Sequence, residues 1–364
     1  DDSMALGFVR RHPLATVGVM AGAVGIAGSR VDSRLDPAGW NPPEPPAMTG
    51  PLNSNRSLTG RETVVECEGP EDVAFDDEGR LYTGTEDGAV VRTTEPVDSE
   101  TTNAEIERFA DTGGRALGME FDGEALLVAA EGAGLLSIDP SGEVTTLSDS
   151  ADGRDIVFAD DLYVADDGTV YFTDATVHEL FQDELFELQD TGRLLAYHPD
   201  SGETTVELTG LGFGNGVCLH EDGESLLITE TSRYRITRYW VDGDRAGEAE
   251  TFAENLPGYP DNIEVADDGD HWVAIPSLRD STLDGLHRVP WAKRQLRKLP
   301  ETVLEQVSGD AYGLVLRLDS AGNIVESLHD PTGGVFGVTS ATPHDGALYL
   351  GSLFGYRVVR CPLE

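Results

Sequence analysis

Four residues with oxygen-bearing side chains occupy the same position in a pattern that repeats along the chain. Glu71, Asp160, Asn215 and Asp261 each stand eight positions before a glycine that closes an acidic turn. Each opens a short run of alternating apolar residues, and a second such run follows the turn. Carboxylate and amide oxygens at equivalent points of a repeat could hold a hard cation or move a proton. Acids that served only solubility would be scattered without regard to this offset.

The repeating unit has the pattern of a β-hairpin, because apolar alternation flanks a turn that ends in glycine. A single hairpin buries only one face and needs repeats beside it. The turn glycines are Gly79, Gly123, Gly168, Gly223, Gly269 and Gly346. Most of their spacings are close to the roughly 40–50 residues of a four-stranded propeller blade. The sequence therefore predicts an all-β fold, a six-bladed β-propeller whose inner strands start near residues 71, 115, 160, 215, 261 and 338.

Propeller geometry predicts where these residues lie. The inner strand of every blade lines the channel in the same direction, so equivalent positions form a ring around the axis. Arg115 and Val338 occupy the two ring positions that lack an oxygen donor. We expect the four donors to converge on one ion, at about 2.3–2.6 Å if it is calcium.

The net charge of −42 excludes several classes of partner. Such a charge repels nucleic acid and anionic lipid at ordinary salt. The composition is typical of the solvated surface of a salt-adapted, haloarchaeal protein, since salt screens the self-repulsion. The three cysteines, Cys67, Cys218 and Cys361, are too few and too widely spaced for a disulfide framework or a zinc ribbon. We interpret Cys218 as a buried strand residue rather than a nucleophile beside Asn215.

The first 60 residues differ in composition from the rest. Residues 10–30 contain an arginine pair followed by an uncharged run from Leu14 to Ala27. This run is shorter than the roughly 20 residues that span a bilayer, and it fits a signal peptide better than an uncleaved anchor. We therefore interpret residues 1–30 as a signal or membrane-anchor segment, residues 31–60 as a Pro-rich linker or stalk, and residues 61–364 as the propeller. The protein is expected to be membrane-anchored or exported, with the propeller outside the cytoplasm.

Two features of the propeller are expected to depart from a plain repeat. An extra strand pattern after Arg61 precedes the first blade, and the last blade is one strand short, so we expect the N-terminal strand to close the ring. A helical insertion is expected in blade 5, where the basic cluster 287–298 contains Trp291, Leu296 and Leu299 at the spacing of an amphipathic helix. This helix could be a lid over the channel, a foot on a membrane surface, or a helix packed on its blade.

Several motifs resemble a known family. GPEDVAFD, GRALGMEFDG, FADDLYVADDGTVYFTD, FGNGVCLHEDG, AENLPGYPDNIEVADDG and HDGALYLGSL, taken in this order, are similar to the strictosidine synthase-like branch of the gluconolactonase/paraoxonase superfamily. The resemblance covers about residues 40–364. It implies a six-bladed propeller with calcium or a similar divalent ion at the top of the channel. The residues that match its ligands are Glu71, Asp160 or its neighbour Asp161, Asn215 and Asp261.

The chain departs from the family pattern at two places. Strictosidine synthases carry a catalytic glutamate about eight residues before the HDG turn, where this chain has Phe336. Paraoxonases use a histidine in the second blade, where this chain offers Arg115. Condensation of an amine with an aldehyde and catalysis by a paraoxonase-type histidine are therefore both disfavoured.

Three functions remain to be compared. The leading hypothesis is a calcium-dependent hydrolase of a small lactone or aryl ester, in which the ion polarises the substrate oxygen. Asp261 or Asp161 would act as nucleophile or base, and Arg115 would orient the substrate or, alternatively, pair with a ring acid. The alternative is a non-catalytic, membrane-tethered scaffold or receptor whose metal only braces the channel. A synthase-type amine lyase is a third, less favoured hypothesis.

Overall fold

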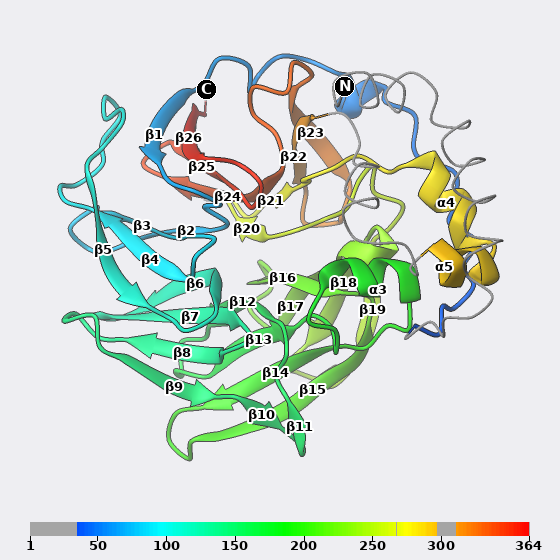
Figure 1. Cartoon of the computed structure of the whole chain (residues 1–364), viewed down its shortest axis with the longest axis horizontal. Coiled ribbons are helices and arrows are strands. Elements are labelled where there is room, and N and C mark those ends of the chain that lie inside the picture. Colours follow the sequence, from blue (N-terminus) through cyan, green and yellow to red (C-terminus); the bar gives the residue numbers. More distant parts are fainter. Residues whose placement is uncertain (1–34, 267, 297–310, 364) are drawn as a thin grey trace, which may run out of the picture.

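Six four-stranded antiparallel sheets surround a common axis in the computed structural model, which Figure 1 shows along that axis. The structure describes residues 35–266, 268–296 and 311–363. In five of the blades the strands pair in sequence order from the inner to the outer strand. The prediction of a six-bladed β-propeller is confirmed.

Each blade is built from consecutive strands. Blade 1 contains β2 (Val73–Phe75), β3 (Leu81–Gly84), β4 (Ala89–Thr93) and β5 (Ile106–Asp111). Blade 2 contains β6 (Arg115–Asp122), β7 (Ala125–Glu131), β8 (Gly134–Ile138) and β9 (Val144–Ser148). Blade 3 contains β12 (Ala159–Val164), β13 (Val170–Asp174), β14 (Gly192–His198) and β15 (Glu203–Leu211). A small hairpin, β10 (Ser150–Ala151) with β11 (Arg154–Asp155), precedes blade 3.

The second half continues the pattern. Blade 4 contains β16 (Gly214–Leu219), β17 (Ser225–Glu230), β18 (Arg235–Trp240) and β19 (Ala249–Ala253). Blade 5 contains β20 (Ile263–Val265), β21 (His271–Ala274), β22 (Gly313–Leu318) and β23 (Ile324–Asp330). Blade 6 contains β24 (Val338–His344), β25 (Ala347–Ser352) and β26 (Arg357–Pro362), with β1 (Glu62–Glu66) as its outer strand. All six inner strands begin within two residues of the predicted positions.

The N-terminal strand closes the propeller as predicted. β1 pairs antiparallel with β26, and Glu62 lies opposite Arg360 in the register. The first and last strands of the propeller thus share one sheet, which removes an open edge. Apolar side chains then fill the spaces between blades; for example, Trp272 and Val315 of blade 5 pack with Leu348 of blade 6.

The helices gather on one face of the propeller. The strands of a blade alternate in direction, so the connection between the second and third strands lies at the end where the inner strand starts. We call this end of the propeller the mouth face. In blade 3 this connection holds α3 (Phe181–Glu187), and in blade 5 it holds α4 (Ser281–His287) and α5 (Pro290–Leu296). In blade 6 it is the loop of residues 353–356 between β25 and β26. The remaining short helices are η2 (Gly50–Leu52) and η3 (Thr231–Arg233).

The Pro-rich linker is not a free stalk. From residue 35 onward it lies against the propeller, where Leu52 is 6% exposed and Leu58 is fully buried. The Trp40 amide donates to the carbonyl of His287 in α4, and the Leu58 amide donates to that of His329 in β23. A chain starting at Arg61 would lose these contacts, so folding should require the linker as well.

The helical insertion in blade 5 is present, but its buried face differs from the prediction. Trp291, expected on the apolar face of α5, is 69% exposed, whereas Lys293 is fully buried. The Lys293 ammonium reaches the carbonyl of Ala38 at 2.8 Å. A contact with a distant segment therefore determines which face of this short helix is buried.

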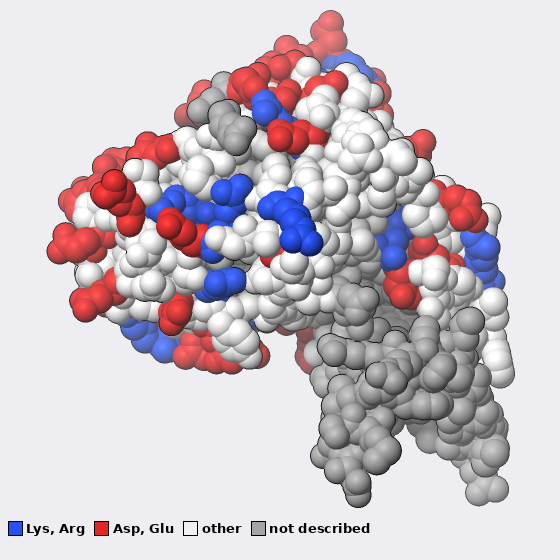
Figure 2. Space-filling model, turned by 90° about the horizontal axis from the view of Figure 1, so that it is seen from above, with Lys and Arg blue, Asp and Glu red and all other residues white. Residues whose placement is uncertain are grey.

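Acidic side chains cover much of the surface. Figure 2 shows them around the outline of the molecule, with basic side chains gathered in the middle of the edge that is in view. Among the described residues, no helix is long and apolar enough to cross a membrane. Residues 10–30, predicted to be a signal or anchor segment, lie outside the described residues.

Candidate metal centre

The four predicted ring residues occupy equivalent places in four blades. Asp160 and Asn215 are the second residues of their inner strands, β12 and β16, while Glu71 and Asp261 lie two residues before β2 and β20. All four are buried at the mouth end, with exposed fractions between 2% and 8%. The sixth ring position, Val338, is fully buried.

Hydroxyl groups of the preceding blades fix the backbone of three ring residues. Thr173 donates to the carbonyl of Asn215 at 2.8 Å, and Thr229 donates to that of Asp261 at 2.6 Å. Thr339 and Ser340 of blade 6 donate to the carbonyl of Glu71 at 2.7 and 2.9 Å. Blades 3, 4 and 6 therefore each help to set the position of the next blade's ring residue.

Glycines allow the blades to approach closely at this level. A Cβ atom on Gly351 of β25 would lie 2.1 Å from the carbonyl oxygen of Glu71. A Cβ atom on Gly118 of β6 would lie 2.6 Å from the Cα atom of Asp161. Neither contact leaves room for a side chain, so the ring depends on these glycines.

The three ring carboxylates lie close enough to affect one another's ionisation. Burial raises the pKa of Glu71 well above its usual value, and the charges of Asp261 and Asp160 add to the effect. Burial and the charge of Asp261 likewise raise the pKa of Asp160. Burial raises the pKa of Asp261 to about 8, although a hydrogen bond from Asn215 opposes the shift. Without a cation, some of these acids therefore hold a proton at neutral pH.

Three of the four ring residues each have a buried side-chain oxygen that accepts no hydrogen bond from a described residue. Glu71 Oε2, Asp160 Oδ2 and Asn215 Oδ1 are buried and have no hydrogen-bond partner among the described residues. Buried polar atoms normally have a partner, and the exceptions call for an explanation such as an ion. Among those same residues, no three His, Cys, Asp or Glu side chains are grouped closely enough to hold a metal ion. The donor types thus fit a hard cation, but their spacing is not that of an assembled coordination shell.

Asp161 has a different environment from Asp160. Its Oδ1 accepts from its neighbour's amide, Leu162 N, and its Oδ2 accepts from Val217 N of blade 4, both at 2.8 Å. Asp72, directly after Glu71, similarly accepts from Met119 N of blade 2 at 3.0 Å. These second-position acids tie neighbouring inner strands together.

Arg115 begins β6 at the mouth end of blade 2. Its Nη2 donates to the carbonyl of Leu353 at 3.0 Å, and its buried Nε has no partner among the described residues. Its charge partly offsets the burial that raises the pKa of Glu131. Of the ion pairs between described residues, none joins Arg115 to a ring acid. The guanidinium is thus held at the mouth without an ion pair to any described carboxylate.

The mouth end also contains an apolar cluster that the sequence did not reveal. Its buried members are Leu117, Phe158, Ala175 and Phe213, and Phe181 of α3 and Leu353 pack against them. Phe158 and Phe213 meet edge to face, with ring centroids 5.4 Å apart. Apolar side chains therefore lie at the same end of the channel as the carboxylates.

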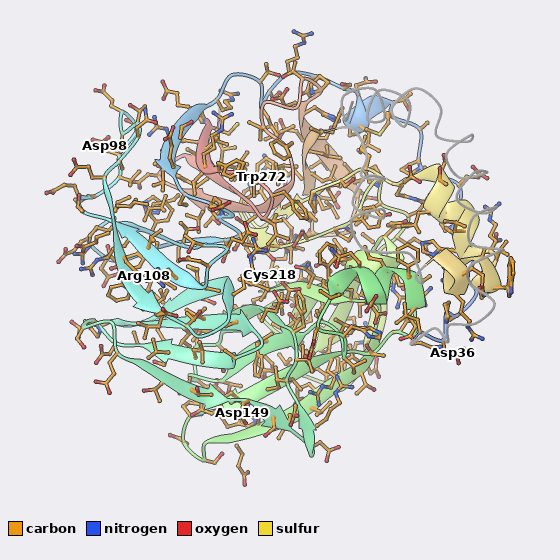
Figure 3. All side chains as sticks on the ribbon, viewed as in Figure 1. Asp36, Asp98, Arg108, Asp149, Cys218 and Trp272 are labelled. Carbon is orange, nitrogen blue, oxygen red and sulfur yellow. The ribbon has the colours of Figure 1, made fainter. Side chains whose placement is uncertain are left out.

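Cys218 and His178 were the cysteine and histidine that the sequence placed nearest to the ring. Cys218 is 5% exposed in β16, and Figure 3 places it near the middle of the molecule, while Asp98 and Asp149 lie at the outer edge. Burial raises the pKa of the Cys218 thiol, which favours the interpretation as a packing residue. His178, near the mouth, contacts Glu187 through Nε2 at 2.7 Å.

Two family models match this propeller. Residues 87–285 match the model described as SMP-30/Gluconolactonase/LRE-like region. Residues 50–93 match the model described as Strictosidine synthase-like, N-terminal. The chain belongs to the SMP-30/gluconolactonase family.

Curated relatives extend the similarity over most of the chain. The adipocyte plasma membrane-associated protein of Salmo salar is 36% identical over 347 residues, covering 88% of this chain and 82% of the relative. The human protein of the same name is also 36% identical, covering 92% and 85%. Protein strictosidine synthase-like 3 of Arabidopsis thaliana is 33% identical, covering 85% and 87%.

Solved structures of gluconolactonase-like propellers share the fold at low identity. A gluconolactonase from Xanthomonas campestris superposes with a TM-score of 0.60 at 16% identity, covering 92% of this chain and 99% of that chain. Regucalcin from Agrobacterium tumefaciens, described as a calcium-binding protein, gives a TM-score of 0.52 at 14% identity, covering 80% and 85%. At these identities the likeness establishes the fold alone.

This SMP-30/gluconolactonase propeller also holds acids that do not occupy the ring position of the repeat. Asp72, Glu120 and Glu264 lie in the channel region, and their pKa values are raised, to about 6 for Asp72 and about 7 for Glu120. Burial is the main cause in each case. The sequence could have indicated Asp72 by its position, because it directly follows a ring residue, as Asp161 does.

Proposed function

We propose that this protein is a cation-dependent hydrolase of small esters or lactones, with calcium or a similar divalent ion at the mouth of the channel. Glu71, Asp160, Asn215 and Asp261 would hold the ion. The proposal rests on the buried oxygens of Glu71, Asp160 and Asn215 that have no partner in the described part of the chain, beside acids that raise one another's pKa. Family membership and the calcium-binding regucalcin neighbour agree with it.

An ion bound there would polarise the substrate's carbonyl oxygen and stabilise the charge that develops on it. The chain's own residues would do the rest. Asp261, once a bound cation keeps it ionised, is a better candidate than Asp161 to accept the proton of an attacking water. Both oxygens of Asp161 already accept backbone bonds. Arg115, which has no carboxylate partner among the described residues, would orient the leaving oxygen or an anionic substrate.

The test is hydrolysis of a panel of lactones and aryl esters, with calcium and with chelator. Turnover should require the cation and should be lost in Asn215→Ala and Asp261→Ala. Glu124→Ala is the control, because Glu124 is exposed in the turn after β6 and belongs to no ring. Turnover that survives both ring substitutions, or that ignores chelator, would exclude the proposed site.

A second candidate function is a non-catalytic membrane-associated scaffold. The observation in its favour is that relatives 36% identical to this chain over the aligned residues are named plasma membrane-associated proteins. Residues 10–30 would tether it. In that case calcium would raise the melting temperature, but no member of the panel would turn over. A synthase-type reaction stays disfavoured, because Phe336 offers only a backbone oxygen, which accepts from Ser352.

A further inference from the structure

Exposed apolar side chains are concentrated on the mouth face. Among the described residues, nine large hydrophobic side chains are exposed. Six of these nine belong to the three connections that lie on the mouth face: Val177, Leu180, Val289, Trp291, Phe354 and Tyr356. A random scatter over the surface would not favour the connections between second and third strands.

The six side chains come from three blades and surround the channel end. Val177 and Leu180, 40% and 41% exposed, lie just before α3. Phe354, 53% exposed, lies in the blade 6 loop, and its ring centroid is 6.5 Å from that of Phe181 in α3. The α3 and blade 6 groups are therefore neighbours across the mouth.

The third group lies in blade 5, at the start of α5. Val289 and Trp291 are 47% and 69% exposed. α5 buries Lys293 and leaves its tryptophan in solvent, which a helix packed only for stability would not favour. Exposed apolar patches in soluble domains mark sites of interaction, and an exposed tryptophan is typical of a membrane interface.

The N-terminal segment reaches the propeller on this same face. The Ala38 amide donates to the carbonyl of Glu187 in α3 at 2.7 Å, and the Lys293 ammonium of α5 donates to the carbonyl of Ala38. The apolar run of residues 14–27 ends eight residues before Leu35. Eight residues span at most about 28 Å. An apolar segment inserted in a bilayer would therefore hold the mouth face next to that bilayer.

We propose that the mouth face rests on a lipid bilayer, with Leu180, Trp291 and Phe354 inserted at the boundary between headgroups and acyl chains. The contact is mainly apolar, because the exposed charges of this face have both signs, with Glu179 between Val177 and Leu180 and Arg288 beside Val289, while the net charge of the chain is −42. Zwitterionic lipid is therefore preferred over anionic lipid, and added salt strengthens binding to anionic vesicles by screening the repulsion. This proposal holds whether or not the protein is an enzyme.

Tryptophan fluorescence of the full chain can test the contact. Trp240 and Trp272 are 4% and 2% exposed, and Trp40 is partly buried, so Trp291 is the tryptophan available to lipid. With phosphatidylcholine vesicles, bromine on the acyl chains should quench the emission severalfold more than unbrominated lipid does. Trp291→Phe should remove most of that quenching.

A double variant distinguishes vesicle binding by the mouth face from binding by the N-terminal apolar segment. Leu180→Ser with Phe354→Ser should weaken vesicle binding and reduce the quenching of Trp291 severalfold. Val325→Ser is the matched control, because Val325 is 44% exposed on the outer strand β23, away from the mouth connections. It should behave like the wild type, and all variants should keep the wild-type melting temperature.

Two outcomes would overturn the proposal. The protein could float with vesicles while brominated lipid leaves its emission unchanged, which would show that the tether alone binds and that the mouth face stays in water. Sedimentation could instead show a dimer without lipid that the paired serine variant dissociates, which would show that a second copy covers the face.

Discussion

Replacing Asp261 with asparagine should stabilise the cation-free protein and reduce the stability that a cation adds. In the cation-free protein, burial raises the pKa of Asp261 from 3.8 to about 8. Between these values the folded state binds more protons than the unfolded state. The stabilising contribution of the protonated carboxyl is therefore complete below about pH 4 and is lost as the pH rises to about 8.

The size of this effect follows from the shift. One pKa unit corresponds to about 1.4 kcal/mol, so the free energy of unfolding should lose on the order of 6 kcal/mol across the window through this residue. Asp261→Asn removes the charge and with it this part of the pH dependence. In chelator at pH 8 the variant should therefore be more stable than the wild type by several kcal/mol.

Calcium should narrow this difference. At a hundredfold excess over its dissociation constant, an ion that binds only the folded state adds about 2.7 kcal/mol. The wild type should show this gain, and the variant should show much less, because it has lost a ring carboxylate. The assay is urea unfolding from pH 4 to 8.5, in chelator and in calcium, with exposed Glu124→Gln as control. A wild type whose stability does not fall with pH in chelator, or equal calcium gains in both proteins, would refute the reasoning.

Three further substitutions test other parts of the structure. Burial lowers the pKa of Lys293 from 10.5 to about 8, so the wild type should gain stability as the pH rises from about 8 to 10.5, and Lys293→Met should abolish that slope in urea unfolding. Asp174→Asn should cost about 3–5 kcal/mol in the same assay, because Asp174 is the buried ion-pair partner of Arg193, which is itself buried. Gly351→Ala should destabilise the fold and weaken calcium binding measured by calorimetry, because its Cβ would displace the backbone of Glu71.

Matched controls accompany two of these predictions. Asp87 forms an exposed ion pair with Arg108, so Asp87→Asn should cost no more than about 1 kcal/mol. Gly285 lies in α4 with open space around it, so Gly285→Ala should be neutral or slightly stabilising. Equal effects of Asp174→Asn and Asp87→Asn would show that the pair with Arg193 is not a buried determinant of stability. Equal effects of the two glycine variants would show that the close approach at Glu71 is unimportant.

The fold could be predicted because its repeat is local. Each turn needs a glycine with positive φ, as at Gly168 and Gly269, where φ is 83° and 88°. Alternation on both sides then identifies the two inner strands of each blade, and the fixed offset gives the ring. The burial of Glu71, Asp160, Asn215 and Asp261 follows from that geometry, whereas their binding of an ion stays a prediction.

Features that depend on contacts between distant segments could not be predicted in this way. Lys293 is buried because its ammonium meets the carbonyl of Ala38, 255 positions earlier in the chain. The helical spacing of apolar residues in α5, taken alone, predicted instead that Trp291 lies on the buried face. The linker shows the same limit, since its prolines indicated an extended spacer but gave no sign that Leu52 and Leu58 pack on the propeller. α3 was missed because its pattern is only seven residues long.

In blades 1 and 3, two adjacent acids at the start of the inner strand have different contacts in the channel. Successive side chains of an extended strand point to opposite sides. At the first position, Glu71 and Asp160 each have an oxygen without a hydrogen-bond partner among the described residues. At the second, Asp72 and Asp161 accept amides of the neighbouring blade, and Asp72 also has one oxygen without such a partner. At the first position a carboxylate would supply the negative oxygens that a cation needs. At the second position a carboxylate accepts hydrogen bonds from the neighbouring blade, because the inner strands of two blades do not pair with each other. The acid pairs Glu71-Asp72 and Asp160-Asp161 thus combine a candidate cation site with the hydrogen bonds that hold neighbouring blades together. A change that shifts one residue of a pair should therefore disturb both the cation site and the contact between blades.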